Sequence, residues 1–477
     1  MTHALVIAVF VVLFAADGLG RGEPGAPSWH LAWIVGGFGV LALAAHLRIL
    51  WCARMLERTG RGPWIARGER AGAAARMLAV VWHGIAVLGF DELGGLRGLF
   101  GPAPALGDAL AVALPLGVFV STLVSFYAVE HRVRSAFALH DAELGRPVRP
   151  VPTRAAFVWA GFRQQVLFIA LPLGCIYAWG LAVTWAWARF GLPWEGTLGA
   201  LAHLAGAVGV FVLIPPAMKW VLNAVRLREG EMRDRLVALG RAHGVRFRDV
   251  LVWRTGGSQV NGAVMGLIAP VRYVLLTDGL LTHLDEREVE AVMAHEVAHV
   301  RRRHLVWLGV SVIGTVSLVG TPIGWLAATL GGIGAGGVVA EVAGLGLTLA
   351  AALLALGYVS RRFEWQADAF AAQHLSGWLG RGEAPAIDAE AAGTMIRALR
   401  QVAHFNSIDP GKFGWRHGSI HTRIARLRGL VGRPADRLRI DREVGWVKLA
   451  SAAAFVVGGV LVLIEAAIEV FVLAPAG

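Results

Sequence analysis

The chain has 477 residues, of which 56% are hydrophobic and only 16% are charged. Water-soluble domains carry about a quarter charged residues, so this composition excludes an ordinary soluble enzyme and a disordered scaffold. The formal charge of +12 includes only three lysines, and the arginines fall in short loops between apolar runs, which argues against nucleic-acid binding. Cys52 and Cys175 lie in or beside apolar runs, which leaves neither a disulfide framework nor a cysteine-based zinc site. We therefore expect a mainly α, polytopic membrane protein.

A membrane-spanning helix needs about 20 apolar residues. Nine segments come near this length, and we predict about nine spans: 3–17, 30–48, 72–90, 105–129, 165–188, 197–222, 305–330, 336–359 and 446–473. The first could instead be a signal peptide, but it lacks a basic leading region, so we expect an uncleaved helix.

The charges of the loops predict which side of the membrane each loop faces. Basic residues crowd every second loop, at 48–76, 130–163, 226–254, 301–303, 361–362 and 416–442. The positive-inside rule then places these loops and the N-terminus in the cytoplasm, and the C-terminus outside. Because arginine so strongly outnumbers lysine, we expect a high-GC, bacterial source and an integral protein of the bacterial inner membrane.

Two polar stretches on the predicted cytoplasmic side suggest one soluble domain that a membrane hairpin splits. We expect a basic helix at 226–243, strands at 247–254 and 271–277, and helices at 285–304, 361–375 and 391–403, with a linker at 376–390. The predicted parts are N-terminal membrane helices (1–222), the first soluble part (223–304), a transmembrane hairpin (305–359), the second soluble part (360–445) and a last membrane helix (446–477).

The sharpest motif is HExxH, at His295, Glu296 and His299, on a predicted helix whose N-cap is Asp285. Residues one turn apart share a helix face, so both imidazoles can bind one metal ion. Glu296 lies beside them, where it can take a proton from a metal-bound water. Zinc lowers the pKa of such a water towards about 7. Because an HExxH motif can also arise by coincidence, the prediction of a metal site requires a third ligand elsewhere in the sequence.

A zinc peptidase of this kind needs a third ligand. A histidine six residues after the motif is excluded, because Leu305 stands there and His304 is one position early. A glutamate from a second helix is the other common solution, and Glu364 in RRFEWQAD supplies one. Asp368, one turn later, is a candidate hydrogen-bond acceptor for a ligand histidine. The alternative is an ordinary solvated helix.

The metal is expected close to the membrane surface but outside the lipid. His299 precedes the predicted span 305–330 by about two turns, and Glu364 follows 336–359 by a similar distance. Residues 285–304 carry nine charged side chains. Each costs about 2.5–3.5 kcal/mol near the bilayer centre, which excludes an intramembrane motif.

With these motifs, the sequence resembles the membrane-bound gluzincin metallopeptidases that include HtpX and the CAAX prenyl endopeptidases. The resemblance covers about 255–304 and 355–428. It implies a zincin-like α+β domain with one Zn²⁺ on His295, His299 and Glu364, Glu296 as general base, and Asp368 behind a ligand histidine.

Two further blocks match the family less closely. Asn261 begins NGAVMG, which resembles the family's edge-strand motif, where Asn261 would bond the substrate backbone; a glycine-rich turn is the alternative. His417 and Arg423 stand in a block resembling the family's late His-Pro…Arg-Ile motif, with Gly418 in place of proline. The resemblance implies that His417 stabilises the oxyanion, with His421 as a rival, and that Arg423 holds the carboxylates near the metal.

The leading hypothesis is a zinc metalloendopeptidase that cleaves membrane-associated or misfolded polypeptides at the cytoplasmic face. Its partners would be a polypeptide substrate and the lipid bilayer, with no nucleic acid, and a homo-oligomer is compatible with the sequence. One alternative is a signal-transducing zinc peptidase that cleaves a cytoplasmic repressor. The other is a membrane scaffold or transporter without peptidase chemistry.

Overall fold

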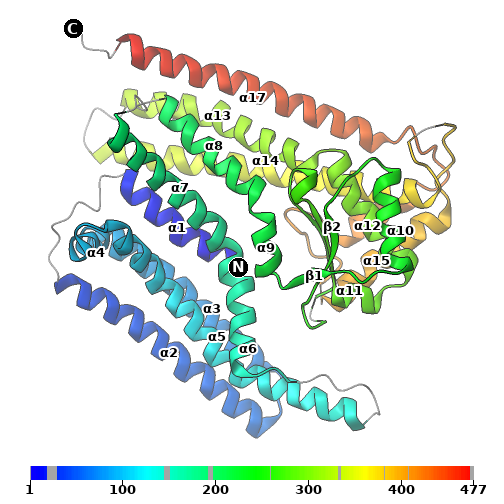
Figure 1. Cartoon of the computed structure of the whole chain (residues 1–477), viewed down its shortest axis with the longest axis horizontal. Helices are drawn as coiled ribbons and strands as arrows, with labels where there is room; N and C mark the ends of the chain where they lie inside the picture. Colours follow the sequence, from blue (N-terminus) through cyan, green and yellow to red (C-terminus); the bar gives the residue numbers. More distant parts are fainter. Residues whose placement is uncertain are drawn as a thin grey trace. The chain divides into compact units, whose positions relative to one another are not determined.

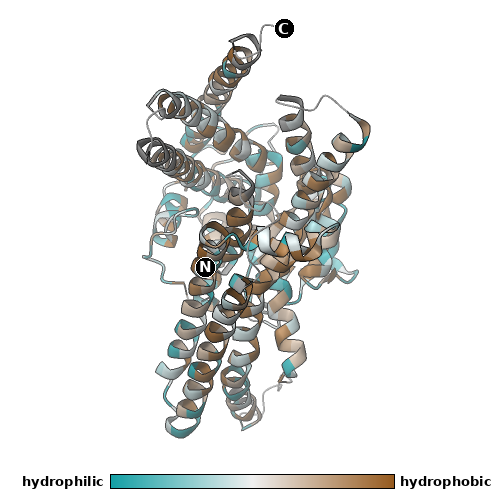
Figure 2. Cartoon of the chain, turned by 90° about the vertical axis from the view of Figure 1, so that its left-hand side faces the viewer, coloured by the Kyte–Doolittle hydropathy of each residue, from teal (hydrophilic) through white to brown (hydrophobic). Residues whose placement is uncertain are grey.

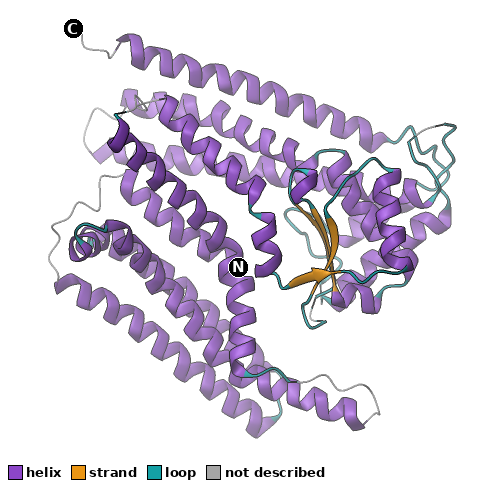
Figure 3. Ribbon diagram, in the orientation of Figure 1, coloured by secondary structure: helices purple, strands orange, loops and turns teal. Residues whose placement is uncertain are grey.

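The computed structural model describes residues 2–18, 29–143, 151–191, 197–257, 259–330, 335–380, 382–406 and 408–472. By its internal contacts the chain divides into two compact units, residues 1–181 and 182–477. Helices make up most of both units, as Figures 1 and 3 show, and the sheet lies in the second.

The first unit is a bundle of helices. Within it α2, α3 and α5 pack against one another, α4 packs on α5, and α1 packs on α3 and α5. Buried apolar residues such as Ile34, Ala79 and Val118 fill these contacts. The elements are α1 (Thr2–Gly18), α2 (Trp29–Thr59), α3 (Pro63–Gly84), η1 (Ile85–Gly89), α4 (Glu92–Phe100), α5 (Pro104–Glu143), α6 (Arg154–Phe162), η2 (Arg163–Leu167) and α7 (Phe168–Phe190), whose residues from 182 onward fall in the second unit.

The second unit contains three long apolar helices, α13 (His304–Leu330), α14 (Ala335–Leu375) and α17 (Arg439–Val472). α13 packs along both α14 and α17 (Figure 1). Its contact with α17 is close because two glycines stand at the crossing. A Cβ on Gly314 would lie 2.7 Å from the backbone nitrogen of Phe455, and one on Gly458 would lie 2.7 Å from Cβ of Ser317. Small residues allow such close helix packing in membranes.

A bent helix pair precedes the sheet. α8 (Thr197–Leu213) and α9 (Pro215–Val221) meet at an angle of 54°. The bend falls where Pro215 removes a backbone N–H and restricts the residue before it.

Seven helices among the described residues are long and apolar enough to cross a membrane, and the bent pair would make eight. Figure 2 shows hydrophobic residues along most of the length of the long helices. The polytopic helical fold class is therefore confirmed. Each of the nine predicted segments overlaps a helix of the structure, of which seven or eight are candidate spans among the described residues. Segment 3–17 forms α1, which at 17 residues is shorter than the usual spanning length.

The soluble part of the second unit is built on a four-stranded sheet in the order β1-β2-β4-β3. β2 and β4 pair in parallel, whereas β1 and β3 run antiparallel to their neighbours. Every residue of β4 is buried, as expected for a central strand covered on both faces. β3 is an edge strand. The strands are β1 (Ala224–Arg226), β2 (Asp249–Trp253), β3 (Gly262–Met265) and β4 (Tyr273–Thr277).

Six further short elements surround the sheet: α10 (Glu231–Ala242), η3 (Ala269–Val271), α11 (Asp278–His283), α12 (Glu286–Arg301), α15 (Ala389–Phe405) and α16 (Ile420–Arg428). One buried cluster unites side chains from before and after the α13–α14 pair, including Met293 of α12, Phe370 of α14, Met395 of α15 and Leu427 of α16. The two polar stretches of the sequence thus share a core.

Two expected boundaries differ from the structure. The predicted span 336–359 and the predicted helix 361–375 are one continuous helix, α14, because no glycine or proline interrupts Tyr358–Leu375. At 41 residues, α14 is roughly 60 Å long, about twice the hydrocarbon thickness. Helix α14 can therefore extend beyond the hydrocarbon layer, and Glu364 lies in its polar C-terminal part. Strand β1, only three residues long, was not predicted, and α10 starts at Glu231 instead of 226.

Candidate metal centre and active site

Helix α12 carries the HExxH motif on a well-capped, half-buried helix. Asp285 and Glu288 form a reciprocal capping box, with side-chain to backbone distances of 2.8 and 3.2 Å. Val289, Met293 and Val297 bury one face of the helix in the core. This packing fixes the rotation of α12, which leaves His295 and His299 stacked one turn apart with ring centroids separated by 5.0 Å.

His295, His299 and Glu364 form a group whose potential ligand atoms all lie within 4.8 Å of one another. The two Nε2 atoms are 3.3 Å apart. Oε2 of Glu364 lies 3.6 Å from Nε2 of His295, and Oε1 lies 3.8 Å from Nε2 of His299. Two imidazoles and one carboxylate suit Zn²⁺ and leave a fourth position for water or substrate.

Asp368 lies behind the first histidine. Its Oδ1 is 3.0 Å from Nδ1 of His295, and its two carboxylate oxygens also accept hydrogen bonds of 2.6 and 2.8 Å from Arg423. Burial lowers the pKa of His295, but the contact with Asp368 and the charge of Glu364 together outweigh burial and raise it. A carboxylate at Nδ1 holds the proton there, which turns the Nε2 lone pair towards the metal position.

Arg423 connects the two acidic residues of α14. Its Nη1 lies 3.4 Å from Glu364, and the whole side chain is buried. Burial disfavours its charge, but Asp368 and then Glu364 outweigh that penalty and raise the pKa of Arg423. The guanidinium therefore keeps both carboxylates ionised and fixed in orientation.

A second chain of contacts lies behind the other histidine. Nδ1 of His304 is 3.0 Å from Nδ1 of His299, and Nε2 of His304 is 2.9 Å from Oε1 of Gln366. The Gln366 amide in turn donates a 2.5 Å hydrogen bond to Asp441 of α17. Since the Gln366 oxygen can only accept, His304 donates from Nε2 and accepts at Nδ1, so His299 donates from Nδ1. The Nε2 lone pair of His299 is then free to bind a metal.

Sequence reasoning missed this second chain. From the sequence, His304 is a candidate only for the third ligand, and no pattern indicates Gln366 or Asp441. The available signal was the position of His304, five residues after His299 where the helix ends. Burial and then the His295 charge lower the pKa of His299 to about 4, which favours the neutral, metal-binding form at pH 7.

Glu296 points to the free edge of β3. The backbone N–H of Val264 donates to its carboxylate, and burial raises its pKa. The helix approaches the strand so closely that a Cβ on Gly262 would lie 2.7 Å from Val292 and 3.5 Å from Cγ of Glu296. This contact explains a glycine at 262. The segment is a strand and not a glycine-rich turn.

The other predicted site residues differ in how close they lie to the candidate metal group. His417, in the turn before α16, lies with Nδ1 3.1 Å from Glu364 Oε1, while its own side chain is 58% exposed. The ring of its rival His421 lies near Gly411 instead. Asn261 is exposed at the start of β3, and its backbone pairs with Thr277.

Residues 226–431 match the model of peptidase family M48. This segment is a peptidase family M48 domain. It contains α12, β3 and all the residues of the candidate metal group. The resemblance to the membrane-bound gluzincins is thereby confirmed.

The chain is also similar to proteins named as HtpX proteases. The chain is 27% identical over 259 residues to "Protease HtpX homolog" of Leptothrix cholodnii, covering 50% of this chain and 79% of that protein. It is 31% identical over 175 residues to "Protease HtpX homolog" of Desulforapulum autotrophicum, covering 32% of this chain and only 55% of that protein. The solved structure "Crystal Structure of S. mikatae Ste24p" covers 85% of this chain and 100% of that chain at 15% identity, with a TM-score of 0.36, a likeness too weak to carry an argument.

Proposed function

We propose that the protein is a zinc-dependent membrane endopeptidase with one zinc ion per chain. The observation that carries this proposal is the convergence of His295, His299 and Glu364 beside Glu296. The M48 domain and the similarity to HtpX proteases support it independently.

A zinc ion on these three ligands would supply an activated water and polarise the scissile carbonyl. Residues of the chain would bind the substrate and transfer the proton. The edge of β3 pairs with the extended backbone of the substrate, and Asn261 bonds the substrate at the start of that edge. Glu296, with its raised pKa, accepts the proton of the attacking water and passes it to the leaving amine.

His417 and Arg423 complete the proposed site. His417 is exposed and lies at the rim, where a small rotation away from Glu364 would direct an N–H towards the developing oxyanion. Arg423 touches no substrate. It positions Glu364 and Asp368, and through Asp368 it positions His295.

We further propose that the substrates are membrane-associated or misfolded polypeptides cleaved at the cytoplasmic face. His304 begins α13 and Glu364 lies in α14, so the candidate metal group is directly attached to two candidate spans. The loop charges support a cytoplasmic position for this end of the spans. A repressor-cleaving peptidase and a non-catalytic scaffold are the alternatives.

The test is zinc content and casein cleavage by the full-length protein in detergent, comparing wild type with Glu296→Gln. Both proteins should bind about one zinc ion, and the substitution should lower cleavage by at least about 100-fold. Glu286→Gln, an exposed carboxylate on the first turn of the same helix, is the matched control and should cleave as the wild type does.

Equal cleavage by wild type and Glu296→Gln would contradict the general-base assignment. A wild-type protein without zinc would contradict the metal centre itself. Zinc binding without any cleavage would favour the alternative function, a non-catalytic membrane scaffold.

A further inference from the structure

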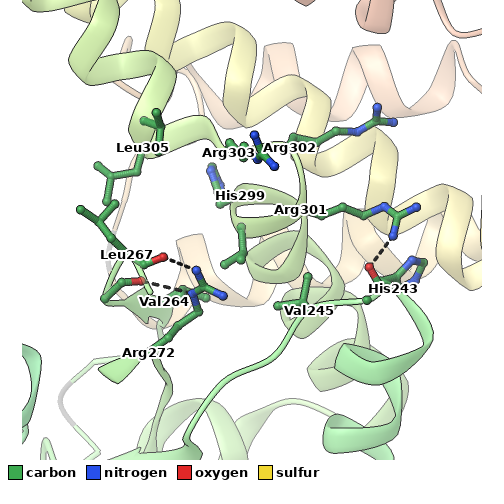
Figure 4. A pocket seen from close by; sticks show the side chains of 14 residues that line it. His243, Val245, Val264, Leu267, Arg272, His299, Arg301, Arg302, Arg303 and Leu305 are labelled. Carbon is green, nitrogen blue, oxygen red and sulfur yellow. Dashed lines mark hydrogen bonds between the residues drawn. The ribbon is translucent and has the colours of Figure 1, made fainter. Parts of the chain in front are cut away.

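A cavity of about 720 Å³ opens beside the proposed metal ligands in the second unit. Figure 4 shows its walls, which include His299 of α12, Leu305 of α13, and Val264 and Leu267 at the end of β3. Three consecutive arginines, Arg301–Arg303, lie between the end of α12 and the start of α13 and line the cavity too. The cavity is thus continuous with one metal ligand and reaches the start of a candidate span.

The lining is cationic. It contains Arg272 besides Arg301–Arg303, and none of the described residues that line it is acidic. Arg272 donates to the backbone carbonyls of Gly266 and Arg246, at 3.3 and 2.9 Å, and these hydrogen bonds hold its guanidinium against the cavity wall without neutralising it. Arg303 is exposed.

Two of the four arginines that line the cavity have no acidic partner among the described residues, so their charge is available to a ligand. Within the described part of the chain, neither Arg272 nor Arg303 has a carboxylate oxygen within 4.0 Å, whereas Arg302 is paired with Asp441 at 3.4 Å. Other arginines of the unit are paired with carboxylates, among them Arg226, Arg233, Arg235, Arg397, Arg423 and Arg439. An anionic group is therefore the ligand that the cavity would attract.

The cavity lies at a defined distance along the substrate path. Glu296 faces the Gly262–Val264 part of β3, because a Cβ on Gly262 would lie 3.5 Å from its Cγ and the N–H of Val264 donates to its carboxylate. The scissile bond would therefore lie opposite these residues. The cavity begins at Val264 and continues to Gly266 and Leu267. At about 3.3 Å per residue, an extended peptide on the β3 edge would reach it roughly two to four residues from the scissile bond.

We propose that this cavity is a specificity subsite for an acidic side chain of the substrate, located two to four residues from the cleaved bond. The inference rests on the proposed peptidase function. Arg303 and Arg272 would bind the carboxylate by charge-assisted hydrogen bonds. Leu305 and Leu267, which also line the cavity, would contact apolar groups of the same segment.

The test uses the full-length protein and pairs of quenched-fluorescent peptides built around a casein cleavage site. Members of a pair differ only by Glu or Gln at one position, two to four residues to either side of the scissile bond. For wild type, kcat/KM should be about tenfold higher with Glu at one such position, which corresponds to about 1.4 kcal/mol. The preference should fall as salt is added.

Arg303→Glu should abolish or invert this preference, measured as the ratio of kcat/KM for the Glu and Gln peptides with the same variant. Arg400→Glu, an equal charge reversal at an exposed position of α15 outside the cavity, should retain the preference. Equal cleavage of both peptides by the wild type, or a preference that survives Arg303→Glu, would overturn the proposal.

Binding measurements separate this proposal from the peptidase function. Fluorescence anisotropy measures the affinity of the Glu296→Gln protein for the Glu and Gln peptides. It reports the preference for Glu even if neither peptide is cleaved. A preference there supports the subsite, and its absence refutes it. A lipid phosphate is the competing occupant. If added phosphatidylglycerol abolishes the preference of the wild type without weakening the Gln peptide, the cavity binds lipid and the polypeptide subsite is wrong.

Discussion

Arg423 is buried between Asp368 and Glu364, and it is the cation on which the order of the candidate metal centre depends. Its two hydrogen bonds to Asp368 use the planar fork of the guanidinium, which a lysine cannot reproduce. Both carboxylates are themselves buried, so they have little access to water as a substitute partner. Loss of the arginine would leave two buried negative charges side by side.

We predict that Arg423→Ala lowers the free energy of unfolding of the metal-free protein by about 3–5 kcal/mol, because breaking a buried ion pair leaves uncompensated charge. Denaturant unfolding in detergent, followed by tryptophan fluorescence, measures this loss. Arg439→Ala removes a pair whose arginine is 85% exposed and should cost no more than about 1 kcal/mol. Similar losses for both variants would show that the buried pair is no stronger than a surface pair.

At the scale of elements, the candidate site depends on four helices that the membrane part holds together. α12 supplies both histidines, α13 begins with His304, α14 supplies Glu364 and Gln366, and α17 supplies Asp441. Packing of α13 against α14 and α17 therefore fixes the chain of contacts that ends on His299. The membrane helices of this unit serve the site as well as anchoring it.

We predict that His304→Ala lowers zinc affinity by about 10- to 100-fold, as expected when the hydrogen-bond partner of a ligand histidine is removed. Gln366→Leu should also lower the zinc affinity, but by a smaller factor. Competition with a fluorescent zinc chelator measures the affinity, and circular dichroism checks that the fold is kept. His283→Ala, on α11 and stacked on Phe405, is the matched control. An unchanged zinc affinity in His304→Ala would show that the contact has no role in orienting His299.

At the scale of the whole molecule, the loop charges predict that 48–76 and the M48 domain face the same, cytoplasmic side, and that 91–104 faces the other. In a chain with Cys52 and Cys175 replaced by alanine, single cysteines at Arg61→Cys and Lys412→Cys should react with an impermeant thiol reagent only in inside-out vesicles. Pro102→Cys should react only in right-side-out vesicles. Labelling of Arg61→Cys and Lys412→Cys on opposite sides would refute the predicted topology.

Local sequence patterns predicted much of this fold. The apolar runs located the long helices, and the caps and apolar spacing around Asp285 and Val289 located α12. The predicted ends of the elements are less accurate. No glycine or proline marks a helix end near Ser360, so α14 continues through the predicted boundary, and β1 is too short to show a pattern.

Local sequence patterns are enough to predict the HExxH helix, the helical membrane class and the candidate residues for a third ligand, since each depends on residues within a few turns of one another. Which distant residues meet is visible in the folded structure alone. His304 and Gln366 are 62 positions apart, Gln366 and Asp441 are 75, and Arg423 and Asp368 are 55. The cationic cavity likewise joins the end of β3 to the end of α12. Such contacts follow from the packing of one core across a membrane hairpin, which no local periodicity records.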